Sequence, residues 1–374
     1  MIAIIIGTRA ELIKTFPVML ELEKRDIEYT FIHTGQHDLG DLVKTFGVKE
    51  PDVVLTPPPR GKTTKFWGRV SKAIAWNLEI VPRIRREIKK CNDLKFVLYH
   101  GDTMSTAAAS IASSELLNPG KSFKNVHLEA GLRSGSIFEP FPEEISRKIA
   151  DRFSDILFAV SDLSAQNLKR EKQKGEIIPV GNTIIDSANY ASLLAEKMRI
   201  NAPSGEYALA TVHRHENIKS RERLKNIIEI LKRVPIKIYF MRYDNTERQL
   251  KKFDLLDSLK SIKNLEITEI KSYVEFIQWL KNAKILFTDG GSVQEESLVF
   301  KVPCIILRKR TERQEGLKTG LNFLSEFDVE RTVNKVEEYL NDKFIIPEFK
   351  NPYGEVGVSQ RIVEYMIKGE RDEK

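Results

Sequence analysis

The chain has 374 residues, of which 41% are apolar and 30% are charged. This length exceeds what one hydrophobic core usually accommodates, so the sequence predicts two domains. The two cysteines, Cys91 and Cys304, lie far apart and lack the paired spacing of a disulfide framework or a zinc site. No apolar run approaches the roughly 20 residues of a membrane span, and residues 1–11 lack the basic region of a signal peptide. We therefore expect a cytoplasmic protein with neither a membrane partner nor a bound metal.

The formal net charge is +7, from 60 basic and 53 acidic residues, which favours an acidic partner. Basic runs such as Arg83–Lys90 fall inside helical patterns, where they are most simply solvent-exposed faces. The chain contains none of the aromatic-rich basic modules that recognise nucleic acid. The charge therefore indicates a small ligand that carries phosphate, and not a nucleic acid.

Short apolar runs alternate with longer amphipathic runs along the first half of the chain. The predicted strands there are 2–6, 29–34, 95–100, 125–129 and 156–160, and the predicted helices are 11–25, 66–90, 105–117, 142–153 and 161–172. The second half repeats the scheme, with strands at 207–212, 237–241, 265–268, 285–288 and 304–307 and helices at 220–233, 272–281 and 293–300. This α/β alternation predicts two doubly wound, Rossmann-like domains, each with a parallel sheet covered by helices.

A domain boundary is expected near residue 180, where Pro179 and Gly181 interrupt a strand-like run. The predicted domains are residues 1–180 and residues 181–357. The remaining segment, residues 358–374, contains a predicted helix at 359–368, and we expect it to pack back on the first domain. Ligands bind at the carboxyl ends of the strands in such folds, so a cleft between the two domains is the expected ligand site.

Polar residues follow five of the predicted strands directly, at 7–9, 101–103, 129–131, 213–216 and 289–292. One such turn would mean little. Five of them favour a single site built from both halves of the chain, because the carboxyl ends of parallel strands meet at one edge of a sheet.

Three acids in the stretch 127–147 are candidates for acid/base chemistry. Glu129 ends an apolar run, and Glu143 and Glu144 open a helix directly after Pro142. Carboxylates held in this way can transfer protons. Acids at a helix N-terminus are also stabilised by the helix dipole, and this purely structural interpretation is favoured for Glu144.

Backbone N–H groups of Gly290, Gly291 and Ser292 precede a predicted helix and would form an anion cradle. Arg9 and Arg313 are candidate phosphate ligands. The alternative interpretations are a tight turn for the glycines and a surface cation for Arg9.

The sequence HRHEN at 213–217 does not have the helical spacing of a zinc site, so His213 is better placed beside a diphosphate. The turn after the first strand is not GxGxxG, which excludes the usual nicotinamide or flavin fingerprint. No GxSxG motif is present to support a serine nucleophile.

Seven motifs together resemble the non-hydrolysing UDP-N-acetylglucosamine 2-epimerases. They are HGDT at 100–103, HLEAGLRSG at 127–135, PFPEEISR at 140–147, VGNTIID at 180–186, DGGSVQEE at 289–296, RKRTERQEG at 308–316 and NPYG at 351–354. The resemblance covers nearly the whole chain in order. It implies a glycosyltransferase-B-like fold, a C-terminal nucleotide-binding domain, and an isomerase that interconverts UDP-GlcNAc and UDP-ManNAc for polysaccharide biosynthesis.

The same resemblance implies the residues of the site. The catalytic residues carried over are Asp102, Glu129, Glu143 and His213, and the substrate-binding residues are Arg9, Lys14, Phe276, Gly290, Gly291, Ser292, Glu296 and Arg313. It implies no cofactor and no metal. The expected partner is a UDP-sugar, and we expect a homodimer.

The resemblance implies elimination of UDP from C1 with loss of the C2 proton, followed by re-addition of UDP to the 2-acetamidoglucal. Asp102, Glu129 and Glu143 would then be the acid/base set, while cations stabilise the leaving UDP. Three alternatives remain open: a 2-epimerase for a UDP-diacetamido-uronic acid, a glycosyltransferase of the same fold, and a nucleotide-sugar sensor without turnover.

The chain departs from the family pattern at a few positions. Ala10 replaces a common Pro, GGS replaces SGG at 290–292, and Lys271 replaces a Gln near the uridine in some members. Bacterial members bind a second UDP-GlcNAc that activates them; Gln36, Arg69, Glu143 and Arg214 match that second site. Leu39 and Arg242 do not, because a Gln and a His are expected there. We therefore expect weakened or absent activation by substrate.

Overall fold

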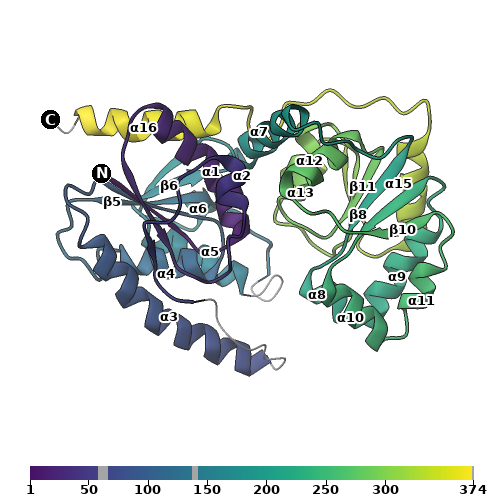
Figure 1. Ribbon diagram of the computed structural model, residues 1–374, viewed down its shortest axis with the longest axis horizontal. Coiled ribbons are helices and arrows are strands. Elements are labelled where there is room, and N and C mark those ends of the chain that lie inside the picture. Colours follow the sequence, from purple (N-terminus) through teal and green to yellow (C-terminus); the bar gives the residue numbers. More distant parts are fainter. Residues whose placement is uncertain (58–65, 137–141, 373–374) are drawn as a thin grey trace. The chain divides into compact units, whose positions relative to one another are not determined.

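The computed structural model describes residues 1–57, 66–136 and 142–372, with side chains described at 1–57, 75–136 and 142–368 (Figure 1). The chain divides into two compact units. Unit 1 consists of Met1–Ser187 together with Tyr353–Lys374, and unit 2 consists of Ala188–Pro352. The first division therefore falls seven residues after the predicted boundary at 180/181, and the second falls five residues before the predicted boundary at 357/358.

Unit 1 contains a seven-stranded parallel sheet with the order β3-β2-β1-β4-β5-β6-β7. Its central strands are buried on both faces, which explains their continuous apolar runs. The strand bounds are β1 Ile2–Ile6, β2 Tyr29–His33, β3 Val53–Val54, β4 Phe96–His100, β5 Lys124–Ala130, β6 Ile156–Ala159 and β7 Glu176–Pro179.

The helices of unit 1 are α1 Arg9–Lys24, α2 Leu42–Phe46, α3 Phe66–Ile88, α4 Met104–Ala112, α5 Glu143–Phe153, α6 Asp162–Arg170 and α16 Val358–Asp372. Helix α7, Ile184–Lys197, contains the division between Ser187 and Ala188. Helix α1 begins with a capping box, in which Thr8 and Glu11 satisfy each other's backbone N–H groups. The last helix, α16, packs along α1 (Figure 1), and Arg25 forms an ion pair with Glu364 at 3.2 Å.

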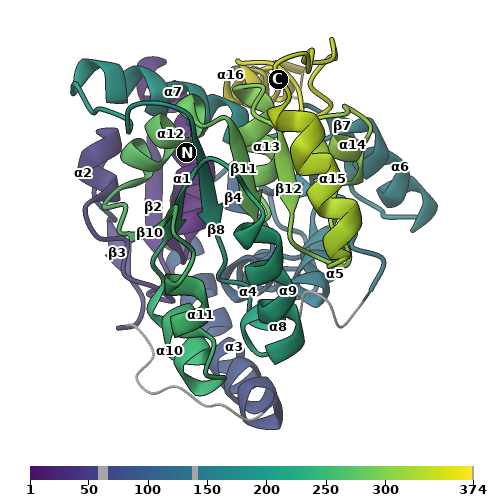
Figure 2. The same cartoon turned by 90° about the vertical axis from the view of Figure 1, so that its right-hand side faces the viewer.

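Unit 2 contains a six-stranded parallel sheet with the order β10-β9-β8-β11-β12-β13. The strands are β8 Tyr207–Thr211, β9 Lys237–Met241, β10 Leu265–Thr268, β11 Ile285–Thr288, β12 Cys304–Ile306 and β13 Asn322–Leu324. The helices are α8 His215–Ile218, α9 Arg221–Lys232, α10 Asp244–Lys252, α11 Leu256–Lys260, α12 Tyr273–Asn282, α13 Val293–Val299, α14 Gln314–Leu317 and α15 Val329–Leu340. Helices α9 and α15 lie side by side (Figure 2) and close the unit's main core.

Two doubly wound parallel sheets confirm the predicted fold class. The prediction omitted β3, β7 and β13, which have two to four residues and are too short for a periodic signal. It also omitted α7, which begins just after the expected domain boundary, and the helices α2, α8, α10, α11, α14 and α15. Among the described residues, no helix is long and apolar enough to cross a bilayer.

Each sheet has one point at which the strand order reverses. In unit 1 this point lies between β1 and β4, and in unit 2 it lies between β8 and β11. Ligands of doubly wound folds bind at the carboxyl ends of the strands beside such a point. Several candidate site residues follow these strands directly, namely Arg9, Asp102, His213 and Gly290–Ser292, whereas Glu129 lies at the end of β5.

Candidate active site

In unit 1, Lys14 and Glu129 form a closed ion pair. The Lys14 Nζ lies 2.7 Å from Glu129 Oε1 and 2.6 Å from Oε2, and both residues are buried. Asn182 donates from its Nδ2 to Glu129 Oε2 at 3.1 Å. The ammonium group therefore compensates the charge of a carboxylate that is removed from water. Two residues that the resemblance assigns to the site are thus brought together.

A local irregularity of β5 positions Glu129. The pairing of β5 with β6 shifts register between Leu128 and Ala130, and Glu129 has a φ of +75°. A non-glycine residue in the left-handed region costs free energy and usually marks a position fixed by function or surroundings. A bulge of this kind changes the direction of a side chain, and the period of two in a strand sequence does not reveal it.

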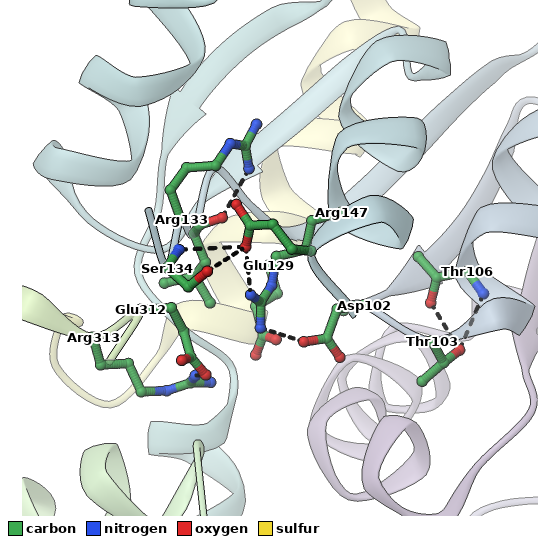
Figure 3. A network of polar contacts seen from close by, with 12 residues as sticks. Asp102, Thr103, Thr106, Glu129, Arg133, Ser134, Arg147, Glu312 and Arg313 are labelled. Carbon is green, nitrogen blue, oxygen red and sulfur yellow. Dashed lines mark hydrogen bonds and ion pairs between the residues drawn. The ribbon is translucent and has the colours of Figure 1, made fainter. Parts of the chain in front are cut away.

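Asp102 is held by a buried arginine that the sequence analysis had not assigned. Figure 3 shows Arg147 donating from its Nη2 to Asp102 Oδ2, and its Nη1 lies 3.0 Å from Glu144 Oε2. The backbone N–H and the hydroxyl of Ser134 also lie 3.3 Å from Glu144 Oε2. Glu144 is buried, and it orients Arg147 through this ion pair.

The other two predicted residues of unit 1 are more open. Glu143 is the first residue of α5 and is half-buried, next to residues 137–141, which lie outside the described part of the chain. Arg9 is exposed, and its Nε donates to the Leu39 carbonyl at 3.3 Å. The side chain of Arg69 also lies outside the described side chains.

A buried carboxylate closes the turn after β1. Glu11 Oε2 accepts hydrogen bonds from the backbone N–H groups of Gly7 at 2.8 Å and Thr8 at 2.7 Å. Its Oε1 accepts from the hydroxyls of Thr103 at 2.6 Å and Thr106 at 2.8 Å. The place that a phosphate occupies in many doubly wound folds is thus filled by the protein's own side chain.

In unit 2, the carboxylate of Asp289 closes the turn after β8 in a similar way. Its carboxylate accepts from the backbone N–H of His213 at 3.0 Å, that of Arg214 at 2.9 Å and Asn217 Nδ2 at 3.0 Å. The side chain of His213 keeps 38% of its surface accessible. Desolvation by the surrounding protein lowers the pKa of His213, although Asp289 acts in the opposite direction. The imidazole therefore stays available to a ligand on one side.

The Gly290–Gly291 turn contacts both residues that were predicted to hold a diphosphate. A Cβ added at Gly290 would lie 3.5 Å from His213 Cε1, and one added at Gly291 would lie 2.8 Å from Arg313 Nη1. The expectation that Gly290 offers its N–H to an anion is wrong, because that N–H donates to Thr288 Oγ1 at 2.9 Å. Gly291 and Ser292 remain as candidate donors at the start of α13.

Three arginines converge on one carboxylate beside this turn. Glu312 Oε1 lies 2.5 Å from Arg313 Nη1 and 3.8 Å from Arg214 Nη2, and Glu312 Oε2 lies 2.9 Å from Arg308 Nη1. Arg313 also contacts Glu295 through its Nε at 3.0 Å. Burial lowers the pKa of Arg308, and its arginine neighbours act in the same direction. An anion would therefore find three guanidinium groups close together here.

The remaining predicted residues of unit 2 lie on α12 and α13. Glu296 is buried and accepts from the Tyr273 hydroxyl at 2.8 Å, and burial together with this carboxylate raises the pKa of Tyr273 well above its ordinary value. Phe276 is 8% exposed. Among the described residues, no three His, Cys, Asp or Glu side chains gather in the way that a metal ion requires.

Sequence reasoning missed several residues of the site, namely Arg147, Asn182, Tyr273 and Glu312. Two signals were present in the sequence. Arg147 follows Glu144 at the i, i+3 spacing of an ion pair along a helix, and Asn182 belongs to the VGNT motif. Nothing in the local pattern distinguishes Glu312 from an ordinary surface acid.

The fold and these strand-end clusters define a two-unit α/β protein of the glycosyltransferase-B-like class. A profile described as UDP-N-acetylglucosamine 2-epimerase matches residues 20–367. The chain is 36% identical to the UDP-N-acetylglucosamine 2-epimerase of Methanocaldococcus jannaschii over 98% of this chain and 99% of that protein. The chain belongs to the UDP-N-acetylglucosamine 2-epimerase family.

Two further comparisons bear on the ligand. A crystal structure of the Methanocaldococcus jannaschii UDP-GlcNAc 2-epimerase in complex with UDP-GlcNAc and UDP matches with a TM-score of 0.83 and 34% identity, over 98% of this chain and 99% of that one. The Pseudomonas aeruginosa UDP-2,3-diacetamido-2,3-dideoxy-D-glucuronate 2-epimerase is 30% identical over 97% of this chain and 98% of that protein.

Proposed function

We propose that this protein interconverts UDP-GlcNAc and UDP-ManNAc by inversion at C2 of the sugar. The observation that carries the proposal is the match, over nearly the full length of both chains, to a relative of this activity whose structure contains UDP-GlcNAc and UDP. The two carboxylate–cation pairs at the strand ends of unit 1 support it.

The proposed reaction is an elimination followed by the reverse addition. The C2 proton of the sugar is not acidic, because no carbonyl is attached to that carbon. The bond from C1 to the UDP oxygen breaks with its electron pair on UDP, C2 loses its proton to a base, and a C1=C2 double bond forms. UDP then adds to C1 again, while a proton is delivered to the opposite face of C2.

The groups of unit 1 would carry out the proton transfers. Asp102, Glu129 and Glu143 form the proposed acid/base set, and positioned carboxylates typically contribute 10²–10⁴-fold to a rate. Lys14 lies against both oxygens of Glu129, so a proton on Glu129 would have to share that position with the ammonium. Lys14 would therefore favour the ionised form of Glu129.

The groups of unit 2 would stabilise the leaving nucleotide. His213 and Arg313 contact the Gly290–Gly291 turn, and the three arginines around Glu312 favour a diphosphate. Because Glu295 and Glu312 already contact Arg313, the diphosphate would use the remaining guanidinium N–H groups or displace one carboxylate. Glu296 and Phe276 would contact the rest of the nucleotide. Assembly as a homodimer and a cytoplasmic location remain part of this proposal.

Incubation with UDP-GlcNAc in heavy water, followed by NMR, tests the proposal. We expect UDP-ManNAc that carries deuterium at C2, formed without added NAD. A product that retained the original C2 hydrogen would exclude the elimination route. Consumption of UDP-GlcNAc only in the presence of an acceptor would instead indicate a glycosyltransferase, and binding without any turnover would indicate a sensor.

A second candidate substrate is a UDP-diacetamido-uronic acid, since a relative with that activity is 30% identical over nearly the whole chain. A comparison of kcat/KM for the two nucleotide sugars decides between them. We expect UDP-GlcNAc to be preferred, because the relative at 36% identity acts on it.

A further inference from the structure

His127 lies on β5, and none of its side chain is exposed. Its Nδ1 is 2.7 Å from Asp151 Oδ1, and its Nε2 is 2.8 Å from the carbonyl oxygen of Gly101. A backbone carbonyl can only accept a hydrogen bond, so Nε2 carries a hydrogen. An ionised carboxylate can also only accept, so Nδ1 carries a hydrogen whenever Asp151 is ionised.

Asp151 has the surroundings of an ionised group. Its second oxygen, Oδ2, lies 2.7 Å from Arg133 Nη2, and the side chain is fully buried. Burial raises the pKa of Asp151, but the contacts with His127 and Arg133 outweigh it, so that the pKa lies below its ordinary value. Arg133 in turn contacts Glu171 Oε2 at 2.6 Å. Negative and positive groups therefore alternate from Glu171 to His127.

We propose that both ring nitrogens of His127 donate hydrogen bonds, as their two acceptors require, and that His127 serves as a positioning residue for Asp102, an inference that rests on the acid/base role proposed above. Gly101 directly precedes Asp102 and has a φ of +80°. Its carbonyl is held by His127, and its N–H donates to the Leu128 carbonyl at 2.9 Å. Strand β5 thus fixes the backbone C=O and N–H groups of Gly101, and Gly101 sets the direction of Asp102.

The other groups around His127 are compatible with a positive charge at this position. Tyr99 of β4 presents its ring at a centroid distance of 5.8 Å. Burial lowers the pKa of His100, also on β4, to about 3, and the neighbouring charges of Glu129 and Asp102 do not restore it. His100 is therefore neutral near pH 7 and does not repel an imidazolium. Asp151 of α5 bonds to His127 directly, and Arg133 and Glu171 extend this row of charges. Helix α5 also carries Glu143, Glu144, Arg147, Lys148 and Arg152.

Selective ¹⁵N labelling of the histidines tests the protonation state in the unaltered protein, without any turnover. We expect both ring nitrogens of His127 to bear hydrogen in the unaltered protein, because each faces a hydrogen-bond acceptor. His33 and His100 serve as internal controls, because burial lowers the pKa of each and each should show one protonated nitrogen near pH 7. A singly protonated His127 at pH 7 would overturn the proposal, whatever the protein's activity.

The Asp151→Asn variant tests the positioning role. Without the carboxylate, Nδ1 of His127 loses its anionic acceptor, so its hydrogen should no longer be held there, and kcat should fall about tenfold with little change in KM. Asp155→Asn is the matched control, since Asp155 bonds to Lys121 and the Asn125 backbone and should leave the His127 signals unchanged. Unchanged kcat together with a deprotonated His127 would refute positioning. If the unaltered enzyme fails to epimerise, only the proposed function falls, because the NMR result is independent of it.

Discussion

The first turn of each sheet is built in the same way in the two units, yet the charges around it differ. Glu11 closes the turn after β1 in unit 1, and Asp289 closes the turn after β8 in unit 2, each by accepting from consecutive backbone N–H groups. In unit 1 the neighbouring carboxylates are paired with single cations, as Glu129 is with Lys14. In unit 2 three arginines share Glu312. The same scaffold therefore carries the proposed acid/base groups in one unit and the proposed anion site in the other.

The largest expected effect is a loss of turnover in variants of the three acids of unit 1. Asp102→Asn, Glu129→Gln and Glu143→Gln should each lower kcat by about 10²-fold or more, since an amide cannot exchange the proton. UDP affinity, measured by calorimetry, should change far less. Glu87→Gln, on α3 and paired with Lys90, is the control. Near-normal turnover of all three variants with collapsed UDP affinity would reverse the assignment.

The complementary effect, a loss of UDP affinity, is expected in variants of unit 2. Arg313→Ala and His213→Ala should each weaken UDP binding by about one to two decades in Kd, which corresponds to the loss of roughly 1.5–3 kcal/mol from one charge-assisted contact. Arg313→Lys should lose less, because the positive charge remains while the forked donor geometry is lost. Arg331→Ala removes an exposed arginine of the same unit and is the control for both. Undiminished affinity in both alanine variants would remove these residues from the diphosphate site.

A third prediction concerns stability and applies to unit 1. The folded protein keeps His100 neutral, with a pKa of about 3, whereas an unfolded chain binds a proton at about 6.5. The unfolded state therefore binds more protons between these values, so stability is complete above about pH 6.5 and is lost as the pH falls towards 3. His100→Gln should flatten this dependence by a few kcal/mol at most in denaturant titrations. His215→Gln, at an exposed position, is the control and should leave the pH dependence unchanged. If stability depended on pH equally in His100→Gln and in the unaltered protein, the assignment would be contradicted.

The smallest expected effect is the absence of activation by substrate, and the prediction depends on one position from each unit. Leu39 of unit 1 is 5% exposed and offers no polar group, and Arg242 of unit 2 bonds to Glu247 at 3.0 Å. Neither reproduces the Gln and His that the resemblance places at a second UDP-GlcNAc site. We expect purified UDP-ManNAc alone to be consumed without a lag. A requirement for traces of UDP-GlcNAc would show that activation survives both changes.

The sequence alone predicted the alternation of strands and helices, and the structure confirms the two parallel sheets that follow from it. It also marked Asp102, Glu129 and His213, because polar residues at the ends of apolar runs can be recognised in the linear sequence. It could not predict the partners. Arg147 reaches Asp102 from 45 residues away, and Lys14 reaches Glu129 from 115 residues away, so that only the fold brings them together. The bulge at Glu129 was equally invisible, since it depends on strand pairing.

The discontinuity of unit 1 has a consequence for synthesis on the ribosome. Helix α1 ends at Lys24, yet α16, which packs against it, begins only at Val358. At a synthesis rate of about 5–20 residues per second, roughly 17–70 s pass between the synthesis of α1 and that of α16. Unit 2 is continuous and is complete before that moment. The buried α16 side chains Val358, Ile362, Val363 and Met366 therefore close unit 1 last, and a nascent chain stalled before residue 358 would leave the surface that α16 covers open to chaperones.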